Sequence, residues 1–317
     1  MRPEPPPVRV AGAHHDIELD LGLIVAGHGR HYLVESPEGR RVLCHPRGKK
    51  SECVVGDQVR WQTTDERGDE GVIEHIEPRR NLLVRQDEFR VKSFAANIDR
   101  LLVLVAAQPV FSESQLARAL IAAESAAIPS LIALNKVDLA EAAQAARDRL
   151  APYRAMGYPV IELALKTQPE AARAALAPHL ATGASLVLGP SGSGKSTLVN
   201  LLVPGALAQV GELSAALNSG RHTTTTTRWY WIDREHKTAL LDSPGFQEFG
   251  LRQLQADTLA DRMPDLRIFQ GQCRFYNCTH VHEPGCAVLD AVRAGTVAAS
   301  RHRIYVELRA ELGQARW

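Results

Sequence analysis

The sequence lacks a strong excess of charge of either sign. Its 37 lysine and arginine residues nearly balance its 36 aspartate and glutamate residues, which leaves a formal net charge of +1 at pH 7. Composition therefore neither favours nor excludes a nucleic-acid partner. Any basic surface must come from local clustering of arginine and lysine.

Long apolar runs are also missing. No segment reaches the roughly 18 consecutive apolar residues that a transmembrane helix needs, so we expect no membrane association. Residues 1–7 have no apolar core of the kind found in a secretory signal. We interpret residues 1–16 as a disordered tail, because this proline-rich stretch has few apolar side chains to bury. These absences predict a cytoplasmic protein whose cysteines stay reduced.

At 317 residues the chain is too long for one ordinary core. We predict a small all-β domain over residues 17–85, because short β-rich runs alternate there with turn clusters. The expected strands are 17–25, 31–34, 41–45, 58–62 and 71–76. This density of strands suits a small barrel, with the OB-fold as the leading candidate and a barrel without a binding role as the alternative.

The pattern changes after Asn97. Residues 101–105 form a continuous apolar run, which is typical of a strand buried on both faces of a parallel sheet. Helical and strand-like segments then alternate, and we assign residues 86–250 to one α/β domain with binding loops at the carboxyl ends of its strands. The further expected elements are helices 114–127, 141–154 and 169–180 and strands 131–134, 159–163, 185–188 and 237–241. We expect residues 251–317 to form a Cys/His-rich, mainly helical C-terminal domain.

A complete phosphate-loop motif follows the strand at 185–188. The pattern G-x-x-x-x-G-K-[ST] is matched by Gly189, Pro190, Ser191, Gly192, Ser193, Gly194, Lys195 and Ser196, and a helix leaves it from Thr197. The glycines let backbone N–H groups turn toward phosphates. Lys195 brings positive charge to the β and γ oxygens, and the Ser196 hydroxyl is placed for Mg²⁺. The motif indicates a nucleoside triphosphate without saying which one.

A candidate guanine-reading segment precedes the phosphate loop in the sequence. It consists of Asn135, Lys136, Val137 and Asp138, at the end of the strand at 131–134. The Asp138 carboxylate can accept hydrogen bonds from N1–H and the 2-amino group of guanine, a donor pair that adenine lacks. Four residues alone would equally fit a helix cap. In the same α/β domain as a phosphate loop, they favour GTP.

A second strand-end carboxylate, Asp242, is placed to hold Mg²⁺ through water. Gly245, three residues later, can bring its amide to the γ-phosphate. Five consecutive threonines, 223–227, lie upstream, and we assign one hydroxyl, that of Thr224, to the metal shell. An edge strand is the alternative for this run, and the sequence does not fix which threonine meets the ion.

Phe246 stands where many GTPases carry the glutamine that orients the attacking water. A phenyl ring cannot perform this task. Either hydrolysis waits for a partner, or another side chain substitutes, and His222 is the nearest candidate.

Four metal-ligating residues, Cys273, Cys278, His280 and Cys286, lie within fourteen residues of one another. A Cys₃His set suits one tetrahedral, structural Zn²⁺, whereas disulfides are disfavoured in a cytosolic chain. His282 remains an alternative to His280. The other two cysteines, in the barrel, suggest no site and are expected to be ordinary buried or half-buried residues.

These motifs resemble the RsgA/YjeQ family of circularly permuted, ribosome-dependent GTPases. The resemblance covers nearly the whole chain and is most specific in the order of the motifs and in the segments 220–225, 242–245 and 278–288. It implies an N-terminal OB-fold barrel, a central circularly permuted α/β P-loop GTPase domain and a C-terminal mainly helical zinc-binding domain. Ala164 and the proline-rich tail depart from the family pattern.

The same resemblance implies a role in late maturation of the small (30S) ribosomal subunit, with conversion of GTP to GDP stimulated by that subunit. His222 matches the family's proposed catalytic residue. We expect a monomer that contacts rRNA. The barrel would supply Arg40, Arg41, Arg47, Lys49, Lys50 and Trp61, and the C-terminal domain Arg293, Arg301 and Arg303. A solvated loop is the alternative for the barrel residues.

Two other functions are alternatives to a GTPase. A kinase or transferase would need an acceptor site and a catalytic base, and the sequence offers no such constellation. An RNA-binding module with a weak or regulatory nucleotide site is the second alternative. The intact set of Lys195, Ser196, Asp242 and Asp138 argues against it.

Overall fold

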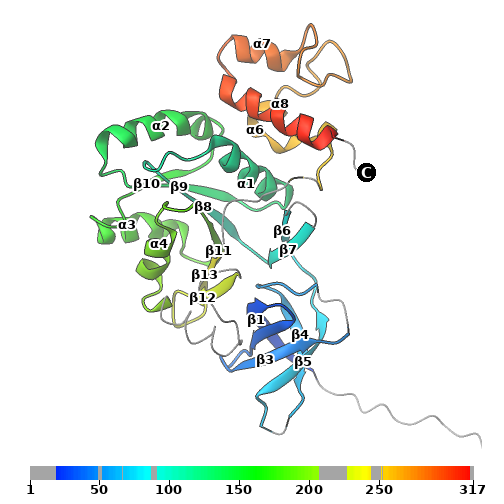
Figure 1. Cartoon of the computed structure of the whole chain (residues 1–317), viewed down its shortest axis with the longest axis vertical. Helices are drawn as coiled ribbons and strands as arrows, with labels where there is room; N and C mark the ends of the chain where they lie inside the picture. Colours follow the sequence, from blue (N-terminus) through cyan, green and yellow to red (C-terminus); the bar gives the residue numbers. More distant parts are fainter. Residues whose placement is uncertain are drawn as a thin grey trace, which may run out of the picture.

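The computed structural model describes residues 19–48, 52–65, 67–86, 91–206, 227–243, 251 and 253–314. Figure 1 shows three bodies in a row, with a β-barrel at one end, an α/β domain in the middle and a helical domain at the other end. The predicted N-terminal tail, 1–16, lies outside the described residues, as do Lys49 and Lys50.

The barrel closes from five strands. They are β1 (Asp20–His28), β2 (His31–Glu35), β3 (Arg41–Pro46), β4 (Gln58–Thr63) and β5 (Glu70–Ile76). β2 pairs with β1 and β3, β3 pairs in parallel with β5, and β4 pairs with both β5 and β1, which closes the ring. Alternate side chains such as Val34, Val42 and Val59 fill its interior. The barrel is OB-like, as the sequence predicts.

The barrel interior corrects one prediction. Trp61 was expected to stack on RNA, but its ring belongs to the barrel core and is only 2% exposed. A base cannot reach it. Cys44 and Cys53 are buried in the same core, and burial raises the pKa of the Cys44 thiol to about 12. The expectation that these cysteines are packing residues is confirmed.

The central sheet has parallel strands in the order β10-β9-β8-β11-β13. Their bounds are Arg100–Ala106 for β8, Ser130–Asn135 for β9, Val160–Leu163 for β10, Gly183–Leu188 for β11 and Thr238–Asp242 for β13. Helices α1 (Glu113–Ser125) and α2 (Ala140–Ala155) cover one face, and α3 (Pro169–Leu176) and α4 (Lys195–Leu202) cover the other. A short 3₁₀ helix, η1 (Ala177–His179), follows α3. The predicted βαβ series is confirmed.

Three strands were not predicted. A hairpin of β6 (Leu82–Gln86) and β7 (Val91–Ala96) links the barrel to β8. The third is β12 (Arg228–Trp231), which runs antiparallel to β13 and also pairs with β1. Because of this pairing, the barrel and the central domain share one continuous sheet.

The C-terminal domain packs short helices over the α1 and α2 side of the central domain (Figure 1). They are η2 (Ala256–Thr258), η3 (Ala260–Arg262), α6 (Pro264–Arg267), α7 (Ala287–Arg293) and α8 (Ala299–Gly313). Among the described residues, no helix combines the length and apolar character needed to cross a membrane.

Arg301 in α8 anchors this domain. Its guanidinium donates to both carboxylate oxygens of Asp265, at 2.8 and 3.1 Å, and lies 5.1 Å from the centre of the Tyr153 ring in α2. The expectation that Arg301 contacts rRNA is wrong, because its side chain is only 3% exposed and is engaged inside the protein. Arg293 and Arg303 remain exposed.

Candidate nucleotide and metal sites

The phosphate loop connects the buried strand β11 to helix α4. Gly192 and Gly194 take φ values of +80° and +102°, which side-chain-bearing residues rarely adopt. A Cβ atom at position 194 would also lie 2.3 Å from the side-chain nitrogen Nδ2 of Asn135. Glycine is therefore required at position 194 for both backbone conformation and space. Ser191, Gly192, Ser196 and Thr197 are exposed, and Ser193 is buried.

The Asn135 side chain joins this loop to two strand ends. Its Nδ2 donates to the Ser193 carbonyl oxygen at 2.8 Å, and its Oδ1 accepts from the Leu165 amide at 3.1 Å. The side chain is buried, at 3% exposed. Sequence reasoning assigned Asn135 to the guanine-reading segment and missed this bracing role, because the motif alone does not reveal which loops lie next to one another.

The rest of that segment projects from the same strand end. Lys136, at φ +63°, donates from Nζ to the Gln108 carbonyl oxygen at 2.7 Å. The Val137 amide donates to the Leu163 carbonyl oxygen at 3.2 Å, which fixes the loop to the end of β10. The Asp138 carboxylate is exposed and therefore accessible to a ligand. The structure thus brings the segment at 135–138 and the phosphate loop to one edge of the sheet.

Lys195 and Asp242 form an ion pair at the same edge, with side chains 18% and 15% exposed. The Lys195 ammonium also donates to the Ser243 carbonyl oxygen at 2.8 Å. The Ser243 hydroxyl donates to the Val187 carbonyl oxygen at 3.2 Å, which ties the end of β13 to β11. A cation suited to phosphate and a carboxylate suited to Mg²⁺ are therefore adjacent. His222, Thr224 and Gly245 lie outside the described residues, as does Phe246.

The predicted metal ligands converge in the C-terminal domain. The ligand atoms of Cys273, Cys278, His280 and Cys286 all lie within 4.8 Å of one another. Sγ of Cys273 is 3.9 Å from Sγ of Cys286, and Nδ1 of His280 is 3.5 and 3.4 Å from these two atoms. A tetrahedral ion with bonds of about 2.3 Å to sulfur would separate its sulfur ligands by roughly 3.8 Å. The four residues therefore fit a metal ion, and the exposed His282 is not among them.

Neighbouring groups orient the histidine ligand. Burial lowers the pKa of His280, which favours the neutral imidazole that a metal needs. Glu283 holds the surrounding turn, because its carboxylate accepts from the amides of Thr279 and Val281 at 2.8 and 3.1 Å. His302 donates to the His280 carbonyl oxygen at 2.7 Å. The cluster is thus supported by a set of internal hydrogen bonds.

The Asn135 contacts generate a testable prediction. Asn135→Ala would leave the Ser193 carbonyl and the Leu165 amide without their buried partner, so we expect the free energy of unfolding to fall by about 1–3 kcal/mol. GTP affinity should fall as well, because the phosphate loop loses its brace. Urea denaturation and a nucleotide titration would measure the two effects. Asn200→Ala, at an exposed position of α4, is the matched control, and equal stability of the two variants would contradict the bracing role.

Known proteins resemble this chain over most of its length. The model of the family described as RsgA GTPase matches residues 76–252. A protein of Variovorax paradoxus named small ribosomal subunit biogenesis GTPase RsgA is 58% identical, with 100% of this chain and 99% of that protein covered. The protein of the same name from Burkholderia pseudomallei is 54% identical, with 94% of each chain covered.

Two solved structures share the overall fold of this chain. The crystal structure of YjeQ from Thermotoga maritima superposes with a TM-score of 0.73 at 30% identity, covering 94% of this chain and all of that one. YloQ, described as a circularly permuted GTPase, gives a TM-score of 0.68 at 26% identity, covering 97% of this chain and all of that one. The circular permutation matches the early position of Asp138 relative to Lys195. With its phosphate loop, its strand-end carboxylates and its Cys₃His cluster, the chain belongs to the RsgA family of GTPases.

Proposed function

We propose that this GTPase acts in late maturation of the small ribosomal subunit, and that the subunit stimulates its conversion of GTP to GDP. The observation that carries the proposal is the convergence of the Asn135–Asp138 loop, Lys195 and Asp242 at one sheet edge. This arrangement provides separate groups for a guanine base, for phosphates and for a metal-binding carboxylate. The relatives that match nearly the whole chain carry small-subunit biogenesis in their names.

Each group has a proposed role in GTP binding. Asp138 would accept from the guanine edge, assisted by Asn135, Lys136 and Val137. The phosphates would lie against the loop formed by Gly189, Pro190, Ser191, Gly192, Ser193, Gly194, Lys195, Ser196 and Thr197, with the Gly245 amide near the γ-phosphate.

Ser196, Thr224 and Asp242 would hold Mg²⁺. The ion, when bound, supplies positive charge at the β and γ oxygens. In the structure Lys195 contacts Asp242. Binding of GTP would therefore require the ammonium to exchange this carboxylate for phosphate oxygens, which frees Asp242 for the metal.

Turnover measurements test the proposal. We expect hydrolysis of GTP but not ATP, and a rise of more than about tenfold when small ribosomal subunits are added. Lys195→Ala should abolish both. Equal use of ATP would contradict the guanine assignment. GTP turnover that the subunit leaves unchanged would instead favour an RNA-binding module with a regulatory nucleotide site.

The proposed contact on the subunit is rRNA. Arg41 and Arg47 pair with Glu35 and Glu74 at 2.7 and 2.5 Å, so within the barrel they are already engaged. Arg40 also donates within the barrel. An interaction with phosphates should weaken as salt rises, which cosedimentation with small ribosomal subunits at graded salt would measure. Binding that does not change with salt would argue against an rRNA contact.

His222 is the proposed catalytic side chain, orienting the attacking water in place of glutamine. Since it would act on the reaction rather than on binding, His222→Ala should lower the turnover number by more than about tenfold while the dissociation constant for GTP changes little. Single-turnover hydrolysis and a binding titration would separate the two quantities. Wild-type turnover in this variant would remove His222 from the mechanism.

The Cys₃His cluster is proposed to hold one structural Zn²⁺, since its four ligands leave no open coordination position for a substrate. Elemental analysis of the purified protein should find one zinc per chain. Cys286→Ser should lower that content and the thermal stability of the C-terminal domain, whereas Cys44→Ser should leave the zinc content unchanged. A different resident metal, or none, would contradict the assignment.

A further inference from the structure

Strand β12 lies between the barrel and the proposed magnesium carboxylate. In the continuous sheet, Arg228 of β12 pairs with Asp242 of β13 on one side and with Ala26 of barrel strand β1 on the other. Asp242 in turn pairs with Val187, at the end of the strand that enters the phosphate loop. One row of backbone partners therefore runs from the barrel to Asp242 and on to β11.

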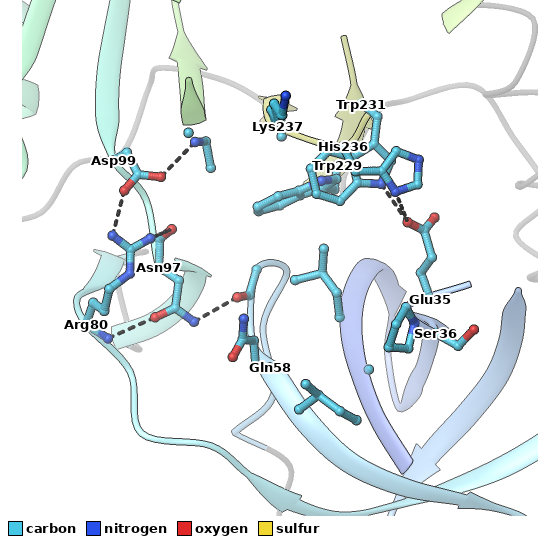
Figure 2. Close-up of a pocket in the computed structure, with 18 of the residues that line it drawn as sticks. Glu35, Ser36, Gln58, Arg80, Asn97, Asp99, Trp229, Trp231, His236 and Lys237 are labelled. Atoms are coloured by element: carbon cyan, nitrogen blue, oxygen red, sulfur yellow. Dashed lines mark hydrogen bonds and ion pairs between the residues drawn. The ribbon is translucent and has the colours of Figure 1, made fainter. Parts of the chain in front are cut away.

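The far end of β12 has a second contact with the barrel. The Trp231 indole N–H donates to the Glu35 carboxylate of β2 at 2.6 Å. Glu35 is only 5% exposed and also accepts from Arg41 at 2.7 Å. The Trp231 ring stacks on His236, with ring centres 4.5 Å apart and planes inclined by 2°. Figure 2 shows Glu35, Trp231 and His236 together on the right, where β12 meets the barrel. A partly buried hydrogen bond of this length ties β12 to the barrel.

The space beside this contact is not filled by side chains. A cavity of about 570 Å³ lies between the barrel and the central domain, lined on one side by Leu23 and Gln58 and on the other by Trp229 and Ala239. At the opposite wall of the cavity, the side-chain amide of Asn97 donates to the Gly56 carbonyl oxygen of the barrel at 2.8 Å. Beside the cavity, the Trp231–Glu35 hydrogen bond is therefore the side-chain contact that links β12 to the barrel, and Asn97 links the start of β8 to the barrel separately.

We infer that Glu35, acting through Trp231, is a positioning residue for GTP hydrolysis. It fixes β12 to the barrel and thereby sets where its sheet partner β13 presents the Asp242 carboxylate. The inference rests on the proposed role of Asp242 in holding Mg²⁺. It makes the barrel a structural part of the nucleotide site, although Glu35 itself touches neither nucleotide nor metal.

Conservative variants separate the hydrogen bond from general stability. Trp231→Phe keeps an aromatic ring but removes the donor, and Glu35→Ala removes the acceptor. Each should lower the turnover number for GTP and raise the Mg²⁺ concentration for half-maximal hydrolysis by at least about fivefold, the lower end of typical coupling between sites. KM for GTP at saturating Mg²⁺ should stay within about twofold. Glu35→Gln keeps an acceptor oxygen and should restore most of the activity.

Two controls make the test specific. Glu77→Ala breaks a barrel ion pair with Arg60 that has the same 2.6 Å length, but β12 takes no part in it, so its kinetics should equal those of wild type. The double variant Glu35→Ala/Trp231→Phe should be no worse than Glu35→Ala alone, because both changes remove the same Trp231 hydrogen bond and Glu35→Ala has already lost the Arg41 pair. All variants are measured as full-length protein, with folding checked by thermal denaturation.

The outcomes distinguish this inference from the proposed function. A wild-type protein that does not hydrolyse GTP would defeat the proposed function itself. Wild-type turnover and Mg²⁺ dependence in Trp231→Phe would overturn the positioning role alone. So would additive effects in the double variant, or a Glu35→Gln protein as impaired as Glu35→Ala, because either result would point to loss of charge or stability in place of the Trp231 contact.

Discussion

The nucleotide edge of this GTPase depends on the buried amide of Asn135. One side chain satisfies a carbonyl of the phosphate loop and an amide of the loop after β10, at a place where neither group can reach water. An unpaired buried group costs about 1–3 kcal/mol, so the three loops are stabilised only in one mutual arrangement. The exposed Asp138 and the Lys195–Asp242 pair lie at the same sheet edge as this buried side chain.

The circular permutation leaves that arrangement intact. Because the carboxyl ends of parallel strands meet at one sheet edge, the order in which the chain visits them does not change which side chains converge. The permutation does change which strands of the central domain connect to the barrel and to the metal-binding domain. The barrel precedes the first strand of the domain, β8, and the metal-binding domain follows the last, β13. The strand β12, at the edge of the central sheet, then becomes the place where the barrel joins.

Much of the fold could be predicted because its signals are local. Continuous apolar runs located β8 and β9, and four ligands within fourteen residues identified the metal cluster. The features that the sequence did not predict depend on contacts between segments far apart in the chain. β12 is four residues long, and one of its two partner strands, β1, lies at the other end of the chain. Trp61 and Arg301 belong to residue types common in RNA contacts, but a barrel core and Asp265 engage them. The Asn135 brace spans 58 residues, so no local pattern reveals it.

The pairing of Ala26 with Arg228 also protects the central domain. A sheet that ended at β12 would present a row of unpaired backbone N–H and C=O groups, which is the usual template for unwanted strand addition. The barrel closes on itself through β1 and β4 and places β1 against that row. Removal of the barrel would therefore expose the backbone edge of β12 beside the nucleotide site. The central domain would then depend on the barrel for its solubility, although the barrel closes without the central domain.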